Sequence, residues 1–463
     1  MSWTQENGYW RRPLDCHDKL FKSIAAAGAP LGREHWVMVH WLQLSFPSAT
    51  EPIVQEQRLR SAWSALRCRH PDVALTLHED EKRYEPLVDD HDLQRWTAAT
   101  FHVETEVRSA DELFSRHLKI APSAHATCHW IPASSELAIV SSHWRWDGRG
   151  VTMMLHSFMD LLGSNPSLSS SLPSSLATAG AEAKYLVPTL DTIIGAPTVP
   201  KEELERKADE LLAPFMDGSP AIGLPVAPAV PGDTVRTAIV FPRAVTTAVL
   251  EACRARGIRL AAALHASIVL ETARYYKPVE ETAKADVAPK YKSWAAFDLR
   301  RYCPPPFNGE AHAASLRMVA LPLIADPTAS WSELASTFQA CYSQSLAPPD
   351  SDILFVRVPY VEKATAMLGS APPTTEPNLS NLGVLDNYFQ RRYGDVEVRD
   401  AALAVQMLSA QLYVHTWRWD EQMRVSICYN EAFYEEQFVR GWLEGLKANL
   451  LENLGIDNSD ITN

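Results

Sequence analysis

The chain has 463 residues. A chain of this length usually folds around more than one hydrophobic core, so two domains are expected. With 46% hydrophobic and 21% charged residues, its composition is that of a globular protein and excludes collagen-like and largely disordered chains. The formal net charge of -13 argues against nucleic acid or an anionic membrane as a partner, because both bind basic surfaces.

Cysteine usage and the first residues of the chain indicate a compartment. The seven cysteines are odd in number, and no two of them have Cys-x-x-Cys spacing. This usage is typical of a reduced intracellular protein and not of a disulfide scaffold or a zinc site. The start of the sequence lacks an apolar signal core, and no apolar run reaches the roughly 18 residues that a membrane span requires. We therefore expect a cytoplasmic protein with no metal site and no membrane partner.

The first third of the chain alternates between strand and helix patterns. Residues 35–46 are rich in β-branched and aromatic side chains and predict a strand, and apolar spacing over 56–72 predicts a helix that ends before Pro71. Residues 126–131 and 137–142 flank turn-forming residues and predict a hairpin. The second hairpin strand is apolar on both faces, so we expect it to lie in the centre of a sheet.

A change in composition separates the two halves. A helix is predicted over residues 151–162, and a serine-rich and then proline-rich stretch follows it. We therefore expect an N-terminal lobe over 1–170, a crossover linker over 171–232 and a C-terminal lobe over 233–463. Patterns in the second half predict five strands (234–241, 293–301, 312–324, 406–417 and 423–430) and three helices (244–257, 260–276 and 435–450). Strands and helices mixed in both halves indicate an α/β or α+β fold.

The sequence SSHWRWDG, residues 141–148, overlaps the end of the apolar strand. A tight turn there would direct His143 into a cleft, and Gly148 can adopt a backbone conformation that other residues avoid. Asp147 would then pair with a buried cation, because an unpaired buried carboxylate is too costly. A neutral histidine held in this way is a general base, worth about 10²- to 10⁴-fold in rate. A structural histidine and an ordinary Asp-Gly turn are the alternatives.

Part of this pattern returns near the other end as HTWRWDE, residues 415–421. This second copy has no glycine, and it lies between two strand-like runs. We therefore predict that it forms the tip of a hairpin and not a second active site.

Three further segments resemble those of a known superfamily and occur in its order. They are RCRHPDVAL (67–75), FDLRR (297–301) and LSNLGVLD (379–386). With the His-x-x-x-Asp-Gly motif, they make nearly the whole chain similar to the superfamily of plant BAHD enzymes, chloramphenicol acetyltransferase, alcohol acetyltransferases and condensation domains. The chain resembles most its fungal trichothecene 15-O-acetyltransferase branch. Two features differ: Ser142 stands where condensation domains carry another histidine, and the BAHD motif Asp-Phe-Gly-Trp-Gly is absent.

The resemblance implies an α/β fold of two chloramphenicol-acetyltransferase-like lobes, each with a mixed sheet, and an active-site tunnel at their interface. It implies direct transfer of an acyl group, most simply acetyl, from coenzyme A to a hydroxyl of a fungal secondary metabolite. His143 would be the general base, and no acyl-enzyme would form. Asp147 would have a structural role and pair with Arg300 from the second lobe. The small molecule and the acyl-CoA would be the only partners of a monomer without a permanently bound cofactor.

Other roles implied by the resemblance are less specific. Ser380 or Asn381 would stabilise the oxyanion, and Lys290 and Lys292 would attract the phosphates of coenzyme A. The alternatives are a surface charge for Arg300, turn residues for the first pair and a solvated loop for the lysines.

Two other functions fit the same sequence. A condensation-like enzyme would take its acyl group from a carrier protein, or would use the pocket for a cyclisation or an elimination. A catalytically silent ligand-binding protein would keep the fold without the reaction.

Overall fold

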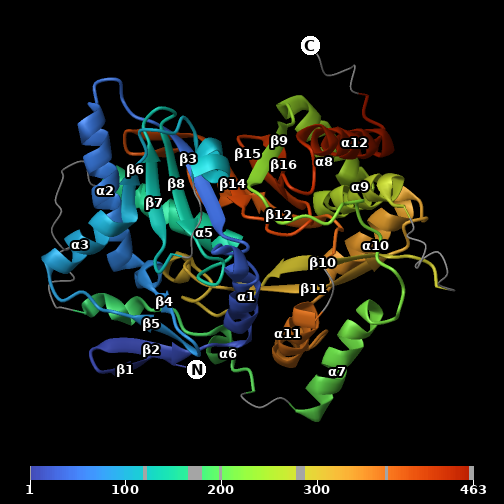
Figure 1. Cartoon of the computed structure of the whole chain (residues 1–463), viewed down its shortest axis with the longest axis horizontal. Coiled ribbons are helices and arrows are strands. Elements are labelled where there is room, and N and C mark those ends of the chain that lie inside the picture. Colours follow the sequence, from blue (N-terminus) through green and yellow to red (C-terminus); the bar gives the residue numbers. More distant parts are fainter. Residues whose placement is uncertain are drawn as a thin grey trace. The chain divides into compact units, whose positions relative to one another are not determined.

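The computed structural model describes residues 2–117, 123–164, 180–197, 201–277, 287–370 and 374–457 (Figure 1). The chain divides into two compact units. Unit 1 consists of Met1–Thr198, Asp298–Met318 and Leu385–Gln406, and unit 2 consists of Val199–Phe297, Val319–Val384 and Met407–Asn463. Two segments from within the range 233–463 therefore pack with unit 1. Residues 171–179 and 198–200 of the expected linker lie outside the described residues.

A six-stranded mixed sheet forms the centre of unit 1, in the order β13-β14-β3-β8-β7-β6. Its strands are β3 (Met38–Ser45), β6 (Phe101–Val103), β7 (Thr127–Ile131), β8 (Glu136–Ser141), β13 (Arg392–Tyr393) and β14 (Val396–Val405). β7 and β8 form the predicted antiparallel hairpin, and β8 also pairs with β3. The side chains from Leu137 to Val140 are all buried, which confirms the central position expected of β8.

Helices and a second, smaller sheet complete unit 1. The helices are α1 (Cys16–Ala26), α2 (Pro52–Arg69), α3 (Asp90–Thr100), α4 (Ala110–Glu112), α5 (Gly148–Ser164) and α6 (Leu190–Ile194). The smaller sheet has the order β1 (Thr4–Glu6), β2 (Tyr9–Pro13), β5 (Glu81–Tyr84) and β4 (Thr76–Leu77). α2 contacts α3, α5 and strands β6 and β7 (Figure 1). It ends at Arg69, because proline at position 71 disfavours a helical residue before it.

Unit 2 contains a four-stranded mixed sheet, in the order β12-β15-β16-β9. These strands are β9 (Thr234–Val240), β12 (Asn378–Val384), β15 (Tyr413–Trp419) and β16 (Gln422–Asn430), and β12 runs parallel to β15. The helices are α7 (Glu202–Leu212), α8 (Arg243–Ala255), α9 (Leu260–Tyr275), α10 (Trp331–Ser343), α11 (Ile353–Ser370) and α12 (Glu436–Leu454). The buried helix α9 packs against α8, α10 and α12. β10 (Tyr291–Asp298) and β11 (Met318–Ala325) form a separate pair.

Three predicted strands are shorter than expected. The strand predicted over 293–301 ends at Asp298, the one over 312–324 begins at Met318, and the one over 406–417 begins at Tyr413. Residues 299–317 instead form short 3₁₀ turns and loops. Their main-chain groups bond to the turn at residues 142–147, called the motif turn below, and not to a strand partner. The carbonyl of Ser315 accepts from the Asp147 N–H at 3.3 Å, and the Arg317 N–H donates to Asp147 Oδ2 at 2.7 Å.

The second WRWD sequence is a hairpin tip, as predicted. β15 and β16 pair antiparallel, with Trp419 opposite Gln422. The two residues between them, Asp420 and Glu421, have φ angles of 52° and 60°. Positive φ at both positions is what a two-residue hairpin turn of type I′ requires. Within the described ranges, no helix combines the length and apolar character needed to cross a bilayer.

Candidate active site

The motif turn after β8 is anchored by its three bulky residues. Trp144, Arg145 and Trp146 are 4%, 1% and 1% exposed, so all three face the interior of unit 1. The Arg145 guanidinium donates to three acceptors: Ser141 Oγ (3.0 Å) and the carbonyl oxygens of Leu75 (2.9 Å) and Ala124 (2.6 Å). These contacts tie the end of β8 to two other segments, so the turn that carries His143 has a fixed position.

The imidazole of His143 is half-buried and lies among aromatic side chains. Phe21 of α1 stacks on it, with ring centroids 4.2 Å apart and 15° between the planes. The ring of Trp36 lies 6.0 Å away. Trp36 has a φ of 63°, which a bulky side chain rarely adopts, and its backbone N–H donates to the carbonyl of Gln406 at 2.9 Å. Backbone strain of this kind concentrates at functional sites.

The surroundings of His143 favour its neutral form. Burial lowers the pKa of His143 to about 4, although the carbonyl of Trp146 and the charge of Asp147 act in the opposite direction. A ring with this pKa is neutral near pH 7 and able to accept a proton. The preceding residue, Ser142, is buried and donates from Oγ to Glu34 Oε2 at 2.9 Å. The Ser142 hydroxyl is therefore engaged in a hydrogen bond inside unit 1.

Asp147 is a buried carboxylate with several donors. Arg300 Nη2 lies 3.0 Å from its Oδ1, and Arg300 Nη1 lies 3.1 Å from its Oδ2. The backbone N–H groups of Arg317 and Gly150 also donate to it, each at 2.7 Å. Burial alone would raise the pKa of Asp147, but Arg300 and these hydrogen bonds together hold it below its ordinary value. The carboxylate therefore stays charged and caps the start of α5.

The structure brings Arg300 to Asp147, but from a different part of the molecule than expected. Arg300 is 5% exposed, so it is not a surface charge, and it lies in a 3₁₀ turn (Arg300–Tyr302) that packs with unit 1 although it falls within the range 233–463 expected for the C-terminal lobe. The loop is closed at its base, where the N–H of Leu299 donates to the carbonyl of Arg317 at 2.7 Å. Arg300 Nη1 also donates to Asp298 Oδ1 at 3.1 Å.

The glycine that geometry requires is Gly150 and not Gly148. Gly148 is the first residue of α5 and has a helical backbone, so the prediction of a special backbone conformation at Gly148 is wrong. A Cβ atom at Gly150 would lie 2.5 Å from the carbonyl oxygen of Ala313 and 3.0 Å from Arg300 Nη2. The loop that carries Arg300 can approach α5 only because this position lacks a side chain.

A second set of hydrogen bonds holds the same loop to α5. His70, in the RHP segment after α2, has its Nε2 2.9 Å from Ser157 Oγ of α5. Ser157 Oγ in turn donates to Glu310 in the loop. Ser157 is fully buried, so this Ser–His pair is a structural contact and not an accessible nucleophile.

Ser380 and Asn381 lie on β12 in unit 2. The pairing of β12 with β15 shifts register between Asn381 and Gly383, and Gly383 has a φ of 77°. The N–H of Gly383 donates to Asn381 Oδ1 at 2.8 Å. This bond orients the Asn381 amide, so that its Nδ2 faces away from Gly383 and remains a donor. Asn381 is exposed and Ser380 is half-buried.

Lys290 directly precedes β10 and Lys292 is the second residue of that strand, and both are paired with the same carboxylate. Lys290 Nζ is 2.5 Å from Asp217 Oδ2, and Lys292 Nζ is 2.9 Å from Asp217 Oδ1. Lys292 also donates to the carbonyl of Phe215 at 3.0 Å and is only 6% exposed. Asp217 therefore offsets part of the charge that would attract a phosphate.

Sequence reasoning missed several residues of this site. Phe21 and Trp36, which surround His143, have no local signal, because ordinary core aromatics occur at similar spacings. Gly150 could have been noticed from the repeated glycine of DGRG, residues 147–150. Lys82, which bonds to the motif turn, lies in a strand that reads as a solvated charged one.

Comparison with known proteins finds relatives that span nearly the whole chain. No model of a protein family matches the chain. The acetyltransferase pigO of Monascus ruber is 29% identical, over 98% of this chain and 99% of its own length. The O-acetyltransferase pigM of Monascus ruber is also 29% identical, over 99% of this chain and 88% of its own length.

The solved structures agree on the fold. The TRI3 trichothecene 15-O-acetyltransferase from Fusarium sporotrichioides superposes with a TM-score of 0.79, covering 97% of each chain at 16% sequence identity. At this identity the likeness shows a shared fold. The chain is therefore similar to fungal acetyltransferases over nearly its whole length, and it shares the fold of a solved trichothecene 15-O-acetyltransferase.

Proposed function

We propose that the protein transfers an acetyl group from acetyl-CoA to a hydroxyl of a fungal secondary metabolite, with His143 as the general base. The observation that carries this proposal is the presentation of His143. Its imidazole is half-buried, stacks on Phe21 and has a pKa lowered to about 4, on a turn fixed by Asp147 and Arg300. The names of the two Monascus relatives support acetyl transfer, and one of them specifies oxygen as the acceptor atom.

The proposed reaction is a direct displacement. The acceptor hydroxyl attacks the thioester carbonyl while neutral His143 accepts its proton, which gives a tetrahedral oxyanion and an imidazolium. The intermediate then collapses: the C–S bond breaks, and the imidazolium returns the proton to the leaving thiolate. The products are the acetyl ester and free coenzyme A, and no covalent enzyme intermediate forms. Asp147 takes no proton, because Arg300 and two backbone N–H groups keep it ionised.

We assign stabilisation of the oxyanion to the Asn381 side chain, with Ser380 as the other candidate. The bond from Gly383 to Asn381 Oδ1 leaves the amide Nδ2 as a fixed donor. Asn381→Ala is expected to lower kcat by about 10²- to 10³-fold without a matching change in KM. Steady-state kinetics of Asn381→Ala and Ser380→Ala, measured side by side, test this assignment. Wild-type kcat in both variants would rule it out.

The lowered pKa of His143 predicts an unusual pH profile. With a free-enzyme pKa of about 4, the value of kcat/KM should stay nearly constant from pH 8 down to about 5 and fall below that. An exposed histidine would place the acid limb near pH 6.5. His40 and His70 also have pKa values lowered by burial to about 3, so acid destabilises the fold. Each sample is therefore returned to pH 7 and assayed again, so that reversible titration is separated from unfolding.

A panel of acceptors and donors tests the reaction class. Acetyl-CoA is incubated with alcohols and matched amines of secondary-metabolite type, and thiol release and product mass are followed together. The proposal predicts thiol release that depends on the alcohol, with one acetyl group added to it. Activity only with an acyl group on a carrier protein would favour the condensation-like alternative, and loss of water from the substrate would favour an elimination. No turnover with any donor would favour a silent binding protein.

The proposal also covers the compartment, the oligomeric state and the binding of coenzyme A. All seven cysteines lie in the described ranges and none of them forms a disulfide, which fits a reducing compartment such as the cytoplasm. We propose a monomer with no permanently bound cofactor. Lys290 and Lys292 are the candidates for contact with the phosphates of coenzyme A. Their ion pairs with Asp217 reduce the net positive charge that they offer.

A further inference from the structure

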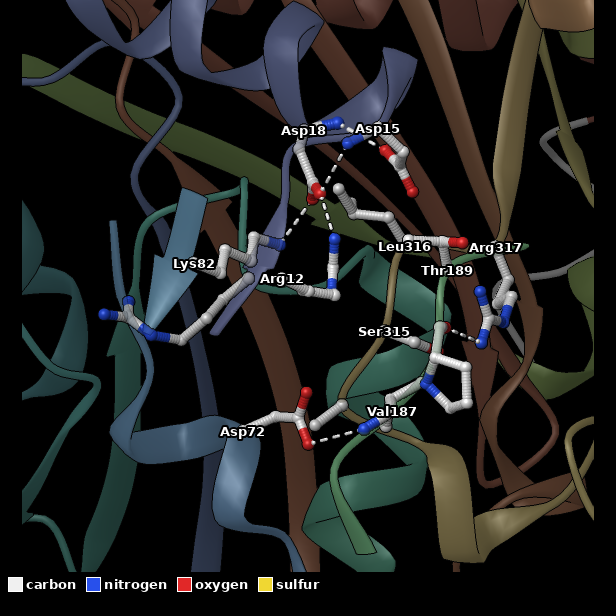
Figure 2. Close-up of a pocket in the computed structure, with 13 residues that line it drawn as sticks. Arg12, Asp15, Asp18, Asp72, Lys82, Val187, Thr189, Ser315, Leu316 and Arg317 are labelled. Atoms are coloured by element: carbon white, nitrogen blue, oxygen red, sulfur yellow. Dashed lines mark hydrogen bonds and ion pairs between the residues drawn. The ribbon is translucent and has the colours of Figure 1, made fainter. Parts of the chain in front are cut away.

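A cluster of buried charges in unit 1 lines a small cavity (Figure 2). Asp18 of α1 accepts from both Arg12 of β2 and Lys82 of β5, each at 2.5 Å. Figure 2 shows the Asp18 carboxylate between these two cationic groups. All three side chains are at least nine-tenths buried, and Lys82 is 2% exposed. A buried lysine is costly to desolvate, so such a position calls for a specific reason.

Substrate binding is not that reason. The cavity beside the cluster has a volume of about 10 Å³, which holds roughly one water molecule and no part of a coenzyme A or of an acceptor. The surrounding charges nearly balance, since Asp15 and Asp72 face the same space as Arg145 and Arg317.

Lys82 connects two elements that both determine where His143 lies. Its Nζ donates to the carbonyl of Trp144, the residue after His143, at 2.7 Å. The same Nζ lies 5.3 Å from the centre of the Trp144 ring. Its ion pair with Asp18 holds the first turn of α1. One ammonium group thus contacts both the turn that carries the imidazole and the helix whose Phe21 stacks on it.

The start of α1 is tied tightly to this ammonium group. Asp15 caps the helix by accepting from the Asp18 N–H at 2.8 Å, and Asp18 accepts from the Asp15 N–H at 3.1 Å. Asp18 therefore fixes the helix start and holds Lys82 at the same time. Phe21 follows Asp18 by three residues, so it lies on the same face of the helix as Asp18. A shift of Asp18 would move the ring of Phe21 with it.

We propose that Lys82 is a positioning residue for catalysis, which holds α1 and the motif turn in one register so that Phe21 and the backbone of Trp144 fix the His143 ring. This inference rests on the proposed function of His143. Lys82 touches no reacting atom in this account. Its role is geometric, because a displacement of about 1 Å at a catalytic group can cost about 10²-fold in rate.

Lys82→Met tests the proposal, with Arg58→Met as the matched control. Arg58 is also a buried cation of unit 1, paired with Asp395 at 2.6 Å. Its other contacts among the described residues are with the Leu162 carbonyl and the Phe46 ring, which lie outside α1 and the motif turn. We expect Lys82→Met to lower kcat about 10- to 100-fold and to leave the KM for acetyl-CoA within about twofold. Arg58→Met should lose comparable thermal stability and keep wild-type kcat. Both enzymes are assayed well below their melting temperatures.

Asp18→Asn serves as a second variant in case Lys82→Met does not fold. It keeps a side chain that can cap α1 but removes the charge that holds Lys82, so kcat should again fall at unchanged KM. Wild-type kcat in either folded variant, or an equal loss of kcat in Arg58→Met, would overturn the proposal. If the wild-type enzyme itself shows no transfer that depends on His143, the proposed function fails, and that result is separate from this one.

Discussion

Replacing His143 with alanine is expected to lower kcat by about 10²- to 10⁴-fold, because the acceptor hydroxyl then has no general base. The KM for acetyl-CoA should change little, since His143 accepts a proton and does not bind the donor in the ground state. Thiol release from acetyl-CoA in the presence of acceptor measures the effect. Because the ring is half-buried, the melting temperature should fall only slightly.

A second histidine of unit 1 provides the control for this variant. His102 is also half-buried, and burial also lowers its pKa, but it lies on β6 at the edge of the sheet. His102→Ala should keep wild-type kcat. If His143→Ala retained full transfer, or if both variants lost it equally, the role assigned to His143 would be wrong.

The second large effect is expected at Asp147. Asp147→Asn keeps the shape of the side chain but removes the charge that compensates Arg300, which is buried beside it. Breaking a buried ion pair from one side typically costs about 3–5 kcal/mol in the free energy of unfolding. We therefore expect a clear drop in melting temperature and, because the motif turn loosens, a drop in kcat measured at a temperature where the variant is still folded.

Asp298 is a second, more exposed partner of Arg300, and the same Asp→Asn substitution there serves as the control. Its carboxylate accepts from Arg300 Nη1 at 3.1 Å, but its side chain is 37% exposed, so water screens the pair. Asp298→Asn should cost about 0–1 kcal/mol and leave kcat close to wild type. An Asp147→Asn enzyme with normal kcat and normal melting temperature would contradict the structural role of the ion pair.

Local sequence patterns predicted the parts of the fold that local forces determine. The apolar run of β8 indicated a central strand, and helical spacing located α2, α5, α8, α9 and α12 to within a few residues. The motif indicated His143 and Asp147, and these predictions follow from residue type and near spacing, which is information that a single sequence contains. The pairing of Asp147 with Arg300, which is 153 residues away, was implied only by the resemblance to a known superfamily.

Long-range packing could not be predicted in this way. β14 pairs with β3 although more than 300 residues separate them, and no local pattern indicates which strand completes a sheet. The placement of Arg300 in unit 1 and the closeness of Gly150 to Ala313 have the same origin. Helix α11 contains Pro359, a helix breaker that obscures its pattern. Lys82 has a charged strand sequence that is typical of solvent exposure, and only the tertiary structure shows that it is buried.

The fate of a labelled acetyl group tests the central claim most directly. Wild-type enzyme is mixed with isotopically labelled acetyl-CoA, with and without an alcohol acceptor, and both protein and small molecules are analysed by mass. Direct transfer by a general base predicts that the labelled acetyl group is bound to the oxygen of the acceptor and that none is retained on the protein. It also predicts that His143→Ala does not form the labelled ester. Label bound covalently to the protein, or an equal yield of ester from His143→Ala, would contradict it.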